Sequence, residues 1–252
     1  MAGTAKLAGV SSGPRVALVI GAGDATGGAI AKRFARGGYT ACVTRRTADR
    51  LTPLVDAIEA EGGQAHGFAS DARVEADVQA LFAKIEAEIG PIEVMVFNIG
   101  ANVRFGITET TERVYRKVWE MAALAGFLVG REAARVMRPR GQGTIIFTGA
   151  TASVRGSVGF CAFAGAKHAL RALAQSMARE LGPQGLHVAH TLIDGAIDTE
   201  FIASNFPERY ALKEKDGILK PEAIAEAYWQ LHRQDRSAWT QEMDLRPWME
   251  TW

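Results

Sequence analysis

Short apolar segments alternate with longer segments of mixed polarity along most of this chain. Strands separated by helices are typical of βαβ units, in which consecutive strands run parallel and helices cover both faces of the sheet. The alternation therefore predicts an α/β fold with a Rossmann-type, doubly wound parallel sheet. The strands are expected at Arg15–Ile20, Thr40–Thr44, Gln64–Ala69, Ile92–Phe97, Gly143–Thr148 and Leu186–Leu192.

Between these strands, apolar residues recur at the spacing of a helix with one buried face. The first such pattern begins at Ala29 and stops at the glycine pair Gly37 and Gly38. Thr47 is placed to cap a second helix, because threonine favours the first position of a helix. Longer helices are expected over Thr110–Met137 and Phe160–Leu181.

A single domain accounts for this organisation. The chain has 252 residues and shows no change of composition that would mark a second domain. We expect residues 1–14 to form a small, polar, flexible leader and residues 15–252 to form the domain. Residues 194–220 depart from the alternation just after the sixth strand. Ligands of open α/β sheets bind at the carboxyl ends of the strands, so this segment is predicted to be a substrate lid; the alternative is a surface connection.

Composition excludes several classes of function. Hydrophobic residues make up 48% of the chain and the net charge is +1, which gives no field for nucleic acid or an anionic membrane. No apolar run approaches the roughly 18 residues of a membrane span. Cys42 and Cys161 lack metal-ligand spacing, and His187 and His190 fall on opposite faces of a predicted strand, so no metal site is expected. A reduced, cytoplasmic location suits the two cysteines.

A glycine-rich turn joins the first strand to the first helix and is the first candidate for chemistry. It spans residues 21–28 and reads Gly-Ala-Gly-Asp-Ala-Thr-Gly-Gly. Glycines let the backbone approach a pyrophosphate, and the helix N-terminus supplies unpaired N–H groups and a positive dipole. The turn therefore favours dinucleotide binding, although glycine spacing alone is also compatible with a simple tight turn.

Several motifs in order resemble the short-chain dehydrogenase/reductase family. The family's TGxxxGxG turn appears here as residues 20–27, with Ile20 for the threonine and Ala25 for the middle glycine. Its Asn-Ala-Gly after strand four appears as residues 98–100, and its segment after strand six as residues 194–199, with Asp194 where the family has proline. The resemblance implies a cofactor site made by Gly21, Asp24, Thr26, Gly27, Asp71, Asn98, Gly100, Lys167, Ile197 and Thr199.

The end of the second strand bears on the choice of cofactor. An acidic residue there would hold the adenosine ribose and repel a 2′-phosphate, whereas arginine binds phosphate with its planar fork. This chain has Arg45 and Arg46, which favour NADP(H) over NAD(H). Asp24 opposes this preference, because it occupies a place where many NADP-preferring relatives carry a basic residue.

The catalytic signature of the family is incomplete. Its YxxxK motif appears as residues 163–167, so Lys167 is retained as the catalytic lysine but Phe163 replaces the proton-donating tyrosine. Ala150 stands for the serine that binds the substrate carbonyl, and Ala123 stands for the asparagine of the proton relay. Replacement groups are conceivable in Tyr210 on the predicted lid and in hydroxyls after strand five, among them Thr151. We place Ala123, Ala150, Phe163 and Tyr210 in the substrate pocket.

The interpretation that follows is an NADP(H)-dependent oxidoreductase with an altered active site, acting on a small apolar or aromatic carbonyl or enone. Two alternatives remain open at this point: a non-catalytic NADP(H)-binding protein, as a sensor or a silent partner subunit, and a non-redox enzyme that reuses the pocket. The resemblance also implies a homo-oligomer, a tetramer or a dimer, that pairs through the helices expected over Val114–Met137 and Phe160–Leu181. The apolar C-terminal residues 245–252 are expected to join an interface.

Overall fold

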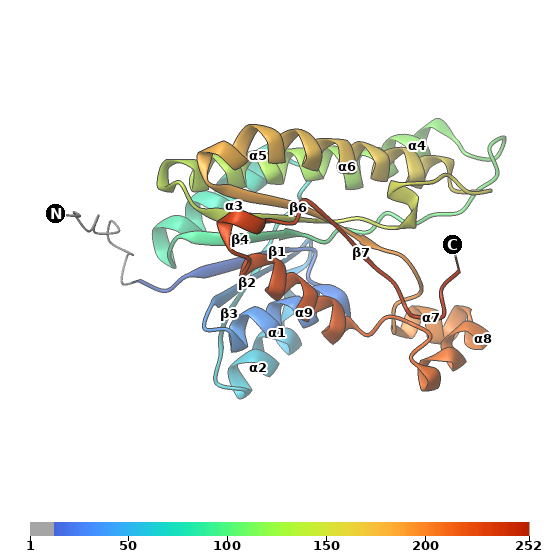
Figure 1. Cartoon of the computed structure of the whole chain (residues 1–252), viewed down its shortest axis with the longest axis horizontal. Helices are drawn as coiled ribbons and strands as arrows, with labels where there is room; N and C mark the ends of the chain where they lie inside the picture. Colours follow the sequence, from blue (N-terminus) through green and yellow to red (C-terminus); the bar gives the residue numbers. More distant parts are fainter. Residues whose placement is uncertain (1–12, 252) are drawn as a thin grey trace.

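Seven parallel strands form the centre of the structure, a computed structural model that describes residues 13–251 (Figure 1). Their order across the sheet is β3-β2-β1-β4-β5-β6-β7, which confirms the predicted Rossmann-type α/β fold in one domain. Most of the expected flexible leader, residues 1–12, lies outside the described residues. The strands are β1 (Val16–Ile20), β2 (Thr40–Arg45), β3 (Gln64–Ala69), β4 (Ile92–Phe97), β5 (Gly143–Thr148), β6 (Leu186–Ile193) and β7 (Glu242–Leu245).

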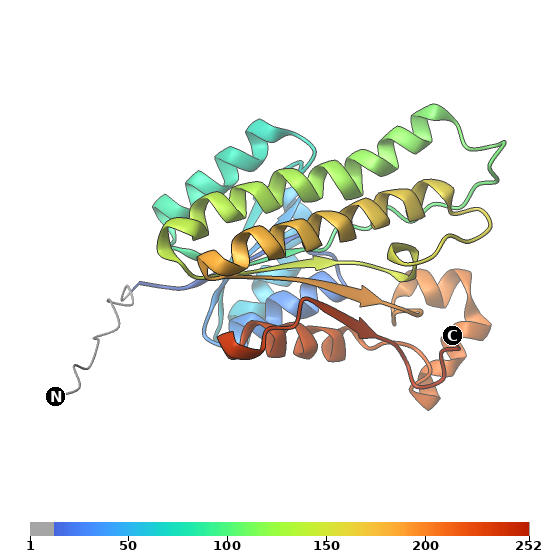
Figure 2. The same cartoon turned by 45° about the horizontal axis from the view of Figure 1, so that its top comes forward.

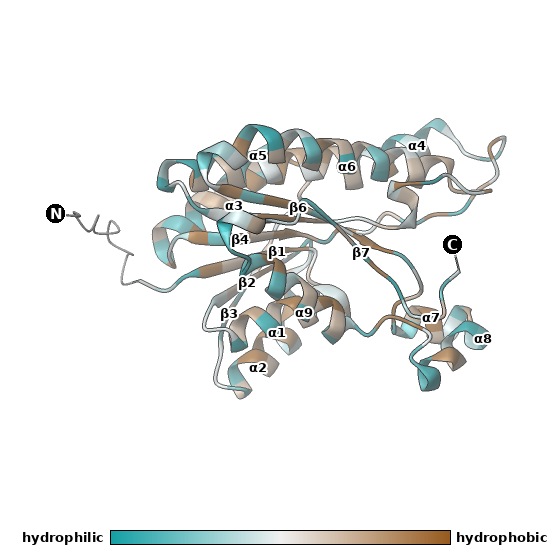
Figure 3. Ribbon diagram, viewed as in Figure 1, coloured by the Kyte–Doolittle hydropathy of each residue, from teal (hydrophilic) through white to brown (hydrophobic). Residues whose placement is uncertain are grey.

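Helices cover both faces of the sheet, as Figure 2 shows. Both faces of the central strands are apolar because each face packs against a helix layer: all residues of β1 and β6 are buried. In Figure 3 apolar residues accordingly dominate the strands. One layer contains α3 (Glu75–Glu88), α5 (Ala125–Met137) and α6 (Cys161–Leu181). The other contains α1 (Thr26–Arg36), α2 (Thr52–Ala60) and α9 (Pro221–His232).

The strand at the edge of the sheet next to β6, β7, was not predicted from the sequence. β6 continues one residue further than expected, to Ile193, and β7 pairs with it in parallel from His190↔Glu242 to Ile193↔Leu245. β7 has only four residues, none of them fully buried. Its pairing depends on a distant segment of the chain, so its short and mixed sequence carries no clear strand signal.

Two predicted helix features differ in the structure. The predicted helix Thr110–Met137 is divided into α4 (Glu112–Trp119), one π turn (Glu120–Leu124) and α5, and Thr111 caps its start. The prediction that Thr47 caps a helix is wrong. Thr47 has extended backbone and makes no capping hydrogen bond; it precedes a 3-10 turn (Ala48–Leu51), and α2 begins only at Thr52.

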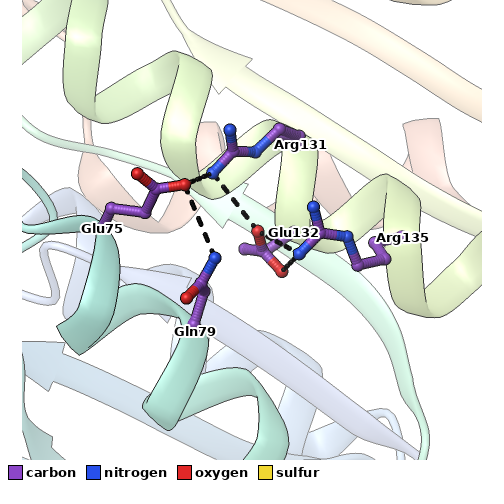
Figure 4. Close-up of polar contacts among 5 residues, drawn as sticks. All are labelled: Glu75, Gln79, Arg131, Glu132 and Arg135. Atoms are coloured by element: carbon purple, nitrogen blue, oxygen red, sulfur yellow. Dashed lines mark hydrogen bonds and ion pairs between the residues drawn. The ribbon is translucent and has the colours of Figure 1, made fainter.

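A cluster of charged side chains joins α3 to α5 (Figure 4). Glu132 is nearly buried on α5, and both of its carboxylate oxygens accept hydrogen bonds from Arg135 at 2.9 Å. Arg131 lies 3.5 Å from Glu132 and also pairs with Glu75 of α3. Because a buried carboxylate is costly without partners, these arginines explain how Glu132 is tolerated beneath the helix pair.

The order of the strands locates the ligand crevice. The chain moves outward in opposite directions from β1 and β4, so the crossovers on either side leave an opening at the carboxyl ends of these two strands. The predicted lid region follows β6 on this side of the sheet. It contains the short helices α7 (Glu200–Asn205) and α8 (Pro207–Tyr210), which lie beside the C-terminal end of the chain in Figure 1.

Candidate active site

Two neighbouring cavities occupy the crevice at the carboxyl ends of the strands. The smaller has a volume of about 250 Å³ and the larger about 1060 Å³. Both touch the glycine turn and the segment after β4, so together they form one groove across the switch between β1 and β4. The residues that line both cavities are Gly21, Gly23, Asn98, Ile99 and Gly100.

The glycine turn leaves its inner surface without side chains. Gly21 has a φ of +85°, a conformation that favours glycine, and a Cβ at Gly27 would lie 2.6 Å from the carbonyl oxygen of Gly21. Gly23 differs, because a Cβ there would meet only the Arg45 guanidinium at 3.9 Å and would project into open space. No side chain caps the N-terminus of α1, and its first turn has no acidic residue. This geometry suits an anion such as a pyrophosphate.

The smaller cavity is lined by the charged residues expected around an adenosine. Arg45 and Arg46 line it, together with Asp71 from the end of β3. Arg45 lies 3.4 Å from Asp24, whose side chain is 93% exposed, so water weakens this pair. Asp71 accepts hydrogen bonds from the side chain of Arg73 at 2.9 and 2.5 Å, and these bonds lower the pKa of the Asp71 carboxyl.

Lys167 lies at the floor of the larger cavity. Helix α6 carries it to the carboxyl ends of β4 and β5, where its Nζ donates to the carbonyl oxygens of Thr148 at 2.8 Å and Ile99 at 3.4 Å. The residue is only 2% exposed, and this burial lowers the pKa of Lys167 to about 8. At neutral pH the Lys167 amine is therefore mainly protonated, although its pKa lies close to neutrality.

Apolar groups stand around Lys167 at two of the positions singled out in the sequence. The ring centroid of Phe163 lies 5.8 Å from Lys167 Nζ, and Phe163 and Ala150 both line the larger cavity. The backbone N–H of Ala150 donates to Ser153 Oγ at 3.1 Å, which fixes the loop after β5. Ser153 itself is fully buried and is not among the residues that line the cavity, so its hydroxyl is not presented to a ligand.

Three residues singled out in the sequence do not line either cavity. Ala123 is buried in the π turn. Tyr210 points its hydroxyl to Lys213, which donates to it at 3.3 Å. Thr199 uses its hydroxyl to cap α7, accepting from the N–H of Ile202 at 3.2 Å. The larger cavity is lined by several of the expected cofactor residues: Gly21, Asp24, Thr26, Gly27, Asn98, Gly100, Lys167 and Ile197.

A polar group at the end of β6 was missed by the sequence reasoning. Asp194 lines the larger cavity, is only 7% exposed, and accepts a hydrogen bond from the hydroxyl of Thr151. Arg246, just after β7, lies 3.1 Å from the other oxygen of Asp194. The one signal in the sequence was the aspartate at a position where the resembling family has proline.

Known proteins share this fold and this order of motifs. A sequence profile of the family described as short chain dehydrogenase matches residues 15–209. The chain belongs to the short chain dehydrogenase family. The family match covers the glycine turn, the strands that border the groove and the helix that carries Lys167.

Individual relatives support the assignment of this chain to the short chain dehydrogenase family. The short-chain reductase protein NovJ of Streptomyces niveus is 30% identical over 239 residues, which cover 92% of this chain and 87% of that protein. A crystal structure of a short-chain dehydrogenase from Rhodopseudomonas palustris is 50% identical, with a TM-score of 0.79, and the match covers 93% of this chain and 99% of that one. An alcohol dehydrogenase from Thermococcus sibiricus, complexed with 5-hydroxy-NADP, is 25% identical with a TM-score of 0.83; here the match covers 94% of this chain and 98% of that one.

No helix within residues 13–251 of this short chain dehydrogenase is both long and apolar enough to cross a membrane.

The two histidines of β6 lie on opposite faces of the sheet, as their spacing predicts. His187 stacks on Trp239 with ring centroids 4.9 Å apart. His190 faces α6 and contacts Glu242 at 3.1 Å, and burial lowers its pKa to about 4. Both histidines therefore serve the packing of the sheet edge.

Proposed function

We propose that the protein is an NADP(H)-dependent oxidoreductase that acts on a small apolar or aromatic substrate through an altered active site. The observation that carries the proposal is the single groove that runs from Arg45 and Arg46, past the bare glycine turn, to the buried Lys167. The alcohol dehydrogenase from Thermococcus sibiricus, whose structure contains 5-hydroxy-NADP, supports a cofactor of this kind.

The residues along the groove fit a nicotinamide dinucleotide in both shape and charge. The open space at Gly23 and the uncapped start of α1 suit the pyrophosphate. Arg45 and Arg46 suit a 2′-phosphate on the adenosine ribose, and Asp71 suits the adenine. Lys167 would hold the nicotinamide ribose by donating from Nζ. When bound in its reduced form, the cofactor supplies a hydride; the protein supplies binding, orientation and the surroundings of the reacting carbon.

The walls of the larger cavity favour an apolar or aromatic substrate. Phe163 and Ala150 offer no hydrogen bond from their side chains. The predicted lid adds Phe201 and Phe206, whose rings lie 6.1 Å apart and are partly exposed. Arg209 of the same region pairs with Glu250 at 3.0 Å, which links the lid to the C-terminal segment. A flat apolar ligand beneath these rings would be shielded from water.

A second function is favoured by one observation, the phenylalanine at the position of the family's tyrosine. Phe163 has no proton to give, which favours a non-catalytic NADP(H)-binding module or a non-redox enzyme as the alternative. Each alternative keeps the same cofactor groove. A screen of NADPH oxidation at high protein concentration, with ketones, enones and imines, separates the oxidoreductase from both alternatives. Turnover of any substrate supports the oxidoreductase, and NADPH binding without turnover supports the binding module or the non-redox enzyme.

NADPH is expected to bind more tightly than NADH by about tenfold to a hundredfold, because charge-assisted hydrogen bonds to a phosphate contribute roughly 1.5–3 kcal/mol. The measurement is a fluorescence titration of each cofactor. Replacing both Arg45 and Arg46 by glutamine should remove most of the difference and leave NADH binding nearly unchanged. Equal affinities in the parent protein would contradict the assignment of the 2′-phosphate to these arginines.

We also expect a homo-oligomer built on the helices next to the groove. Large apolar side chains on the run from α4 to α5 are exposed in the single chain: Tyr115, Trp119, Leu124 and Phe127. Such a patch on one face suggests a contact with a second copy. Light scattering at micromolar concentration should give a multiple of 27.1 kDa, and the double variant Trp119→Glu, Phe127→Glu should reduce it. A monomeric mass for the parent would refute this expectation.

A further inference from the structure

The carboxylate at the end of β6 gives the larger cavity an unusual polarity. Asp194 lies at the buried end of the cavity and accepts the hydroxyl proton of Thr151, the residue after Ala150. Once this proton is directed at Asp194, the Thr151 oxygen offers only its lone pairs to a ligand. The part of the cavity wall formed by Thr151 and Asp194 therefore presents acceptors, whereas a carbonyl oxygen would need a donor.

The missing acid and these acceptors point to the same kind of substrate. A ketone needs a proton for its oxygen when it takes up a hydride, and neither Phe163 nor Ala150 supplies one. A protonated imine carries its proton already and presents an N–H donor with a positive charge. We propose that the substrate is a protonated imine, or in the reverse direction the corresponding amine, with its nitrogen placed at Thr151 and Asp194. This proposal rests on the proposed NADP(H)-dependent function.

The reaction balances without an acid from the protein. A hydride from bound NADPH adds to the carbon of the C=N⁺ group, and the π electron pair becomes the lone pair of the nitrogen. The existing N–H bond is kept, so no proton moves in that step. The neutral amine then takes a proton from water to give an ammonium ion. The protein's part is to hold the N–H group against Thr151 Oγ1 and to balance the positive charge with Asp194.

The charges around the cavity are compatible with a cation at this end. Arg246 is shared between Asp194 and Asp244, so the three groups together carry one net negative charge. Arg209 is paired with Glu250. Arg104 and Arg155 also line the cavity, but both are exposed, so water weakens their effect. Lys167 is the nearby buried cation, and its ammonium is directed to two carbonyl oxygens.

The test compares a charged ligand with a neutral ligand of the same ring shape on the NADPH-saturated protein. Tetrahydroisoquinoline is an ammonium ion near neutral pH, and tetralone is a neutral ketone; isothermal titration calorimetry measures both. We expect the amine to bind at least about tenfold more tightly. Asp194→Asn should weaken amine binding about tenfold and change tetralone binding by less than about twofold. NADPH oxidation should accordingly be faster with dihydroisoquinoline than with tetralone.

Asp244→Asn is the matched control, because Asp244 shares Arg246 with Asp194 but does not line the cavity. Because the Asp244 carboxylate lies on the far side of Arg246, the substitution should weaken amine binding clearly less than Asp194→Asn does, and it should leave tetralone binding within about twofold of the parent. Equal effects of the two variants, or a parent protein that prefers tetralone or binds neither ligand, would overturn the proposal. Thr151→Val provides a second route if Asp194→Asn fails to fold, and it should also remove the preference for the amine. NADPH titration separates the two levels: failure of NADPH to bind contradicts the proposed function, whereas NADPH binding without an amine preference contradicts only this inference.

Discussion

The double variant Phe163→Tyr, Ala150→Ser is expected to reduce aromatic ketones with NADPH roughly 10²–10⁴-fold faster than the parent protein, the range that a positioned general acid contributes. The phenol would stand beside Lys167, whose ammonium lies 5.8 Å from the ring that it replaces. Both positions already line the larger cavity, so each added hydroxyl faces the groove. The parent is expected to be slow with ketones because neither of these side chains can donate a proton.

The single variants provide the controls for this experiment. Phe163→Tyr alone should recover only part of the rate, because the ketone oxygen would still lack the serine hydroxyl. The double variant should exceed both singles, since two hydroxyls that act on one oxygen need not be additive. The assay follows NADPH consumption on one panel of aromatic ketones. Brisk reduction by the parent, or none by a folded double variant, would show that the chemistry lies elsewhere.

Gly23→Leu is expected to weaken NADPH binding by about a hundredfold or more while the protein stays folded. A Cβ at this position would meet nothing closer than Arg45 at 3.9 Å, and a leucine side chain is expected to fill the space left for the pyrophosphate. Losing two charge-assisted hydrogen bonds there, at roughly 1.5–3 kcal/mol each, gives that magnitude. Fluorescence titration measures the binding, and thermal unfolding measures the stability.

Gly182→Leu serves as the matched substitution. A Cβ at Gly182 would meet nothing within 4 Å, so this position is at least as open as Gly23, but it lies after α6 and neither cavity includes it. It should bind NADPH as the parent does. Normal NADPH binding by the Gly23→Leu variant would contradict the placement of the pyrophosphate at the glycine turn. A large loss of stability in Gly23→Leu would instead contradict the open space that the structure shows there.

The parts of the fold that could be predicted from the sequence depend on local patterns. Most of the six predicted strands are apolar enough to be recognised alone, although β3 is mixed in sequence and largely exposed. The glycine turn has its place between β1 and α1. β7 could not be found in the same way, because it is short and gains its stability from pairing with β6. The π turn that divides the predicted helix Thr110–Met137 likewise could not be recognised from the spacing of its apolar residues.

The candidate site shows the same limit at the level of side chains. The motif residues on the first half of the sheet, such as Arg45 and Asn98, could be assigned to the groove because each lies at the carboxyl end of a strand or directly after it. The direction of Tyr210 could not be predicted, because its partner Lys213 depends on how the lid helices pack. Asp194 was visible as a departure from the family pattern. Its contacts with Thr151 and Arg246 join the ends of three strands, so they could not be predicted without the tertiary structure.

The position of β7 also has a consequence for deletions within the chain. Arg246 and Glu250, which contact Asp194 and Arg209 at the larger cavity, lie after β7, whereas the residues that line the smaller cavity all precede β5. A product cut short before β7 would keep the strands and the glycine turn that make the smaller cavity. It would lack Arg246, which contacts Asp194, and Glu250, which pairs with Arg209 of the predicted lid.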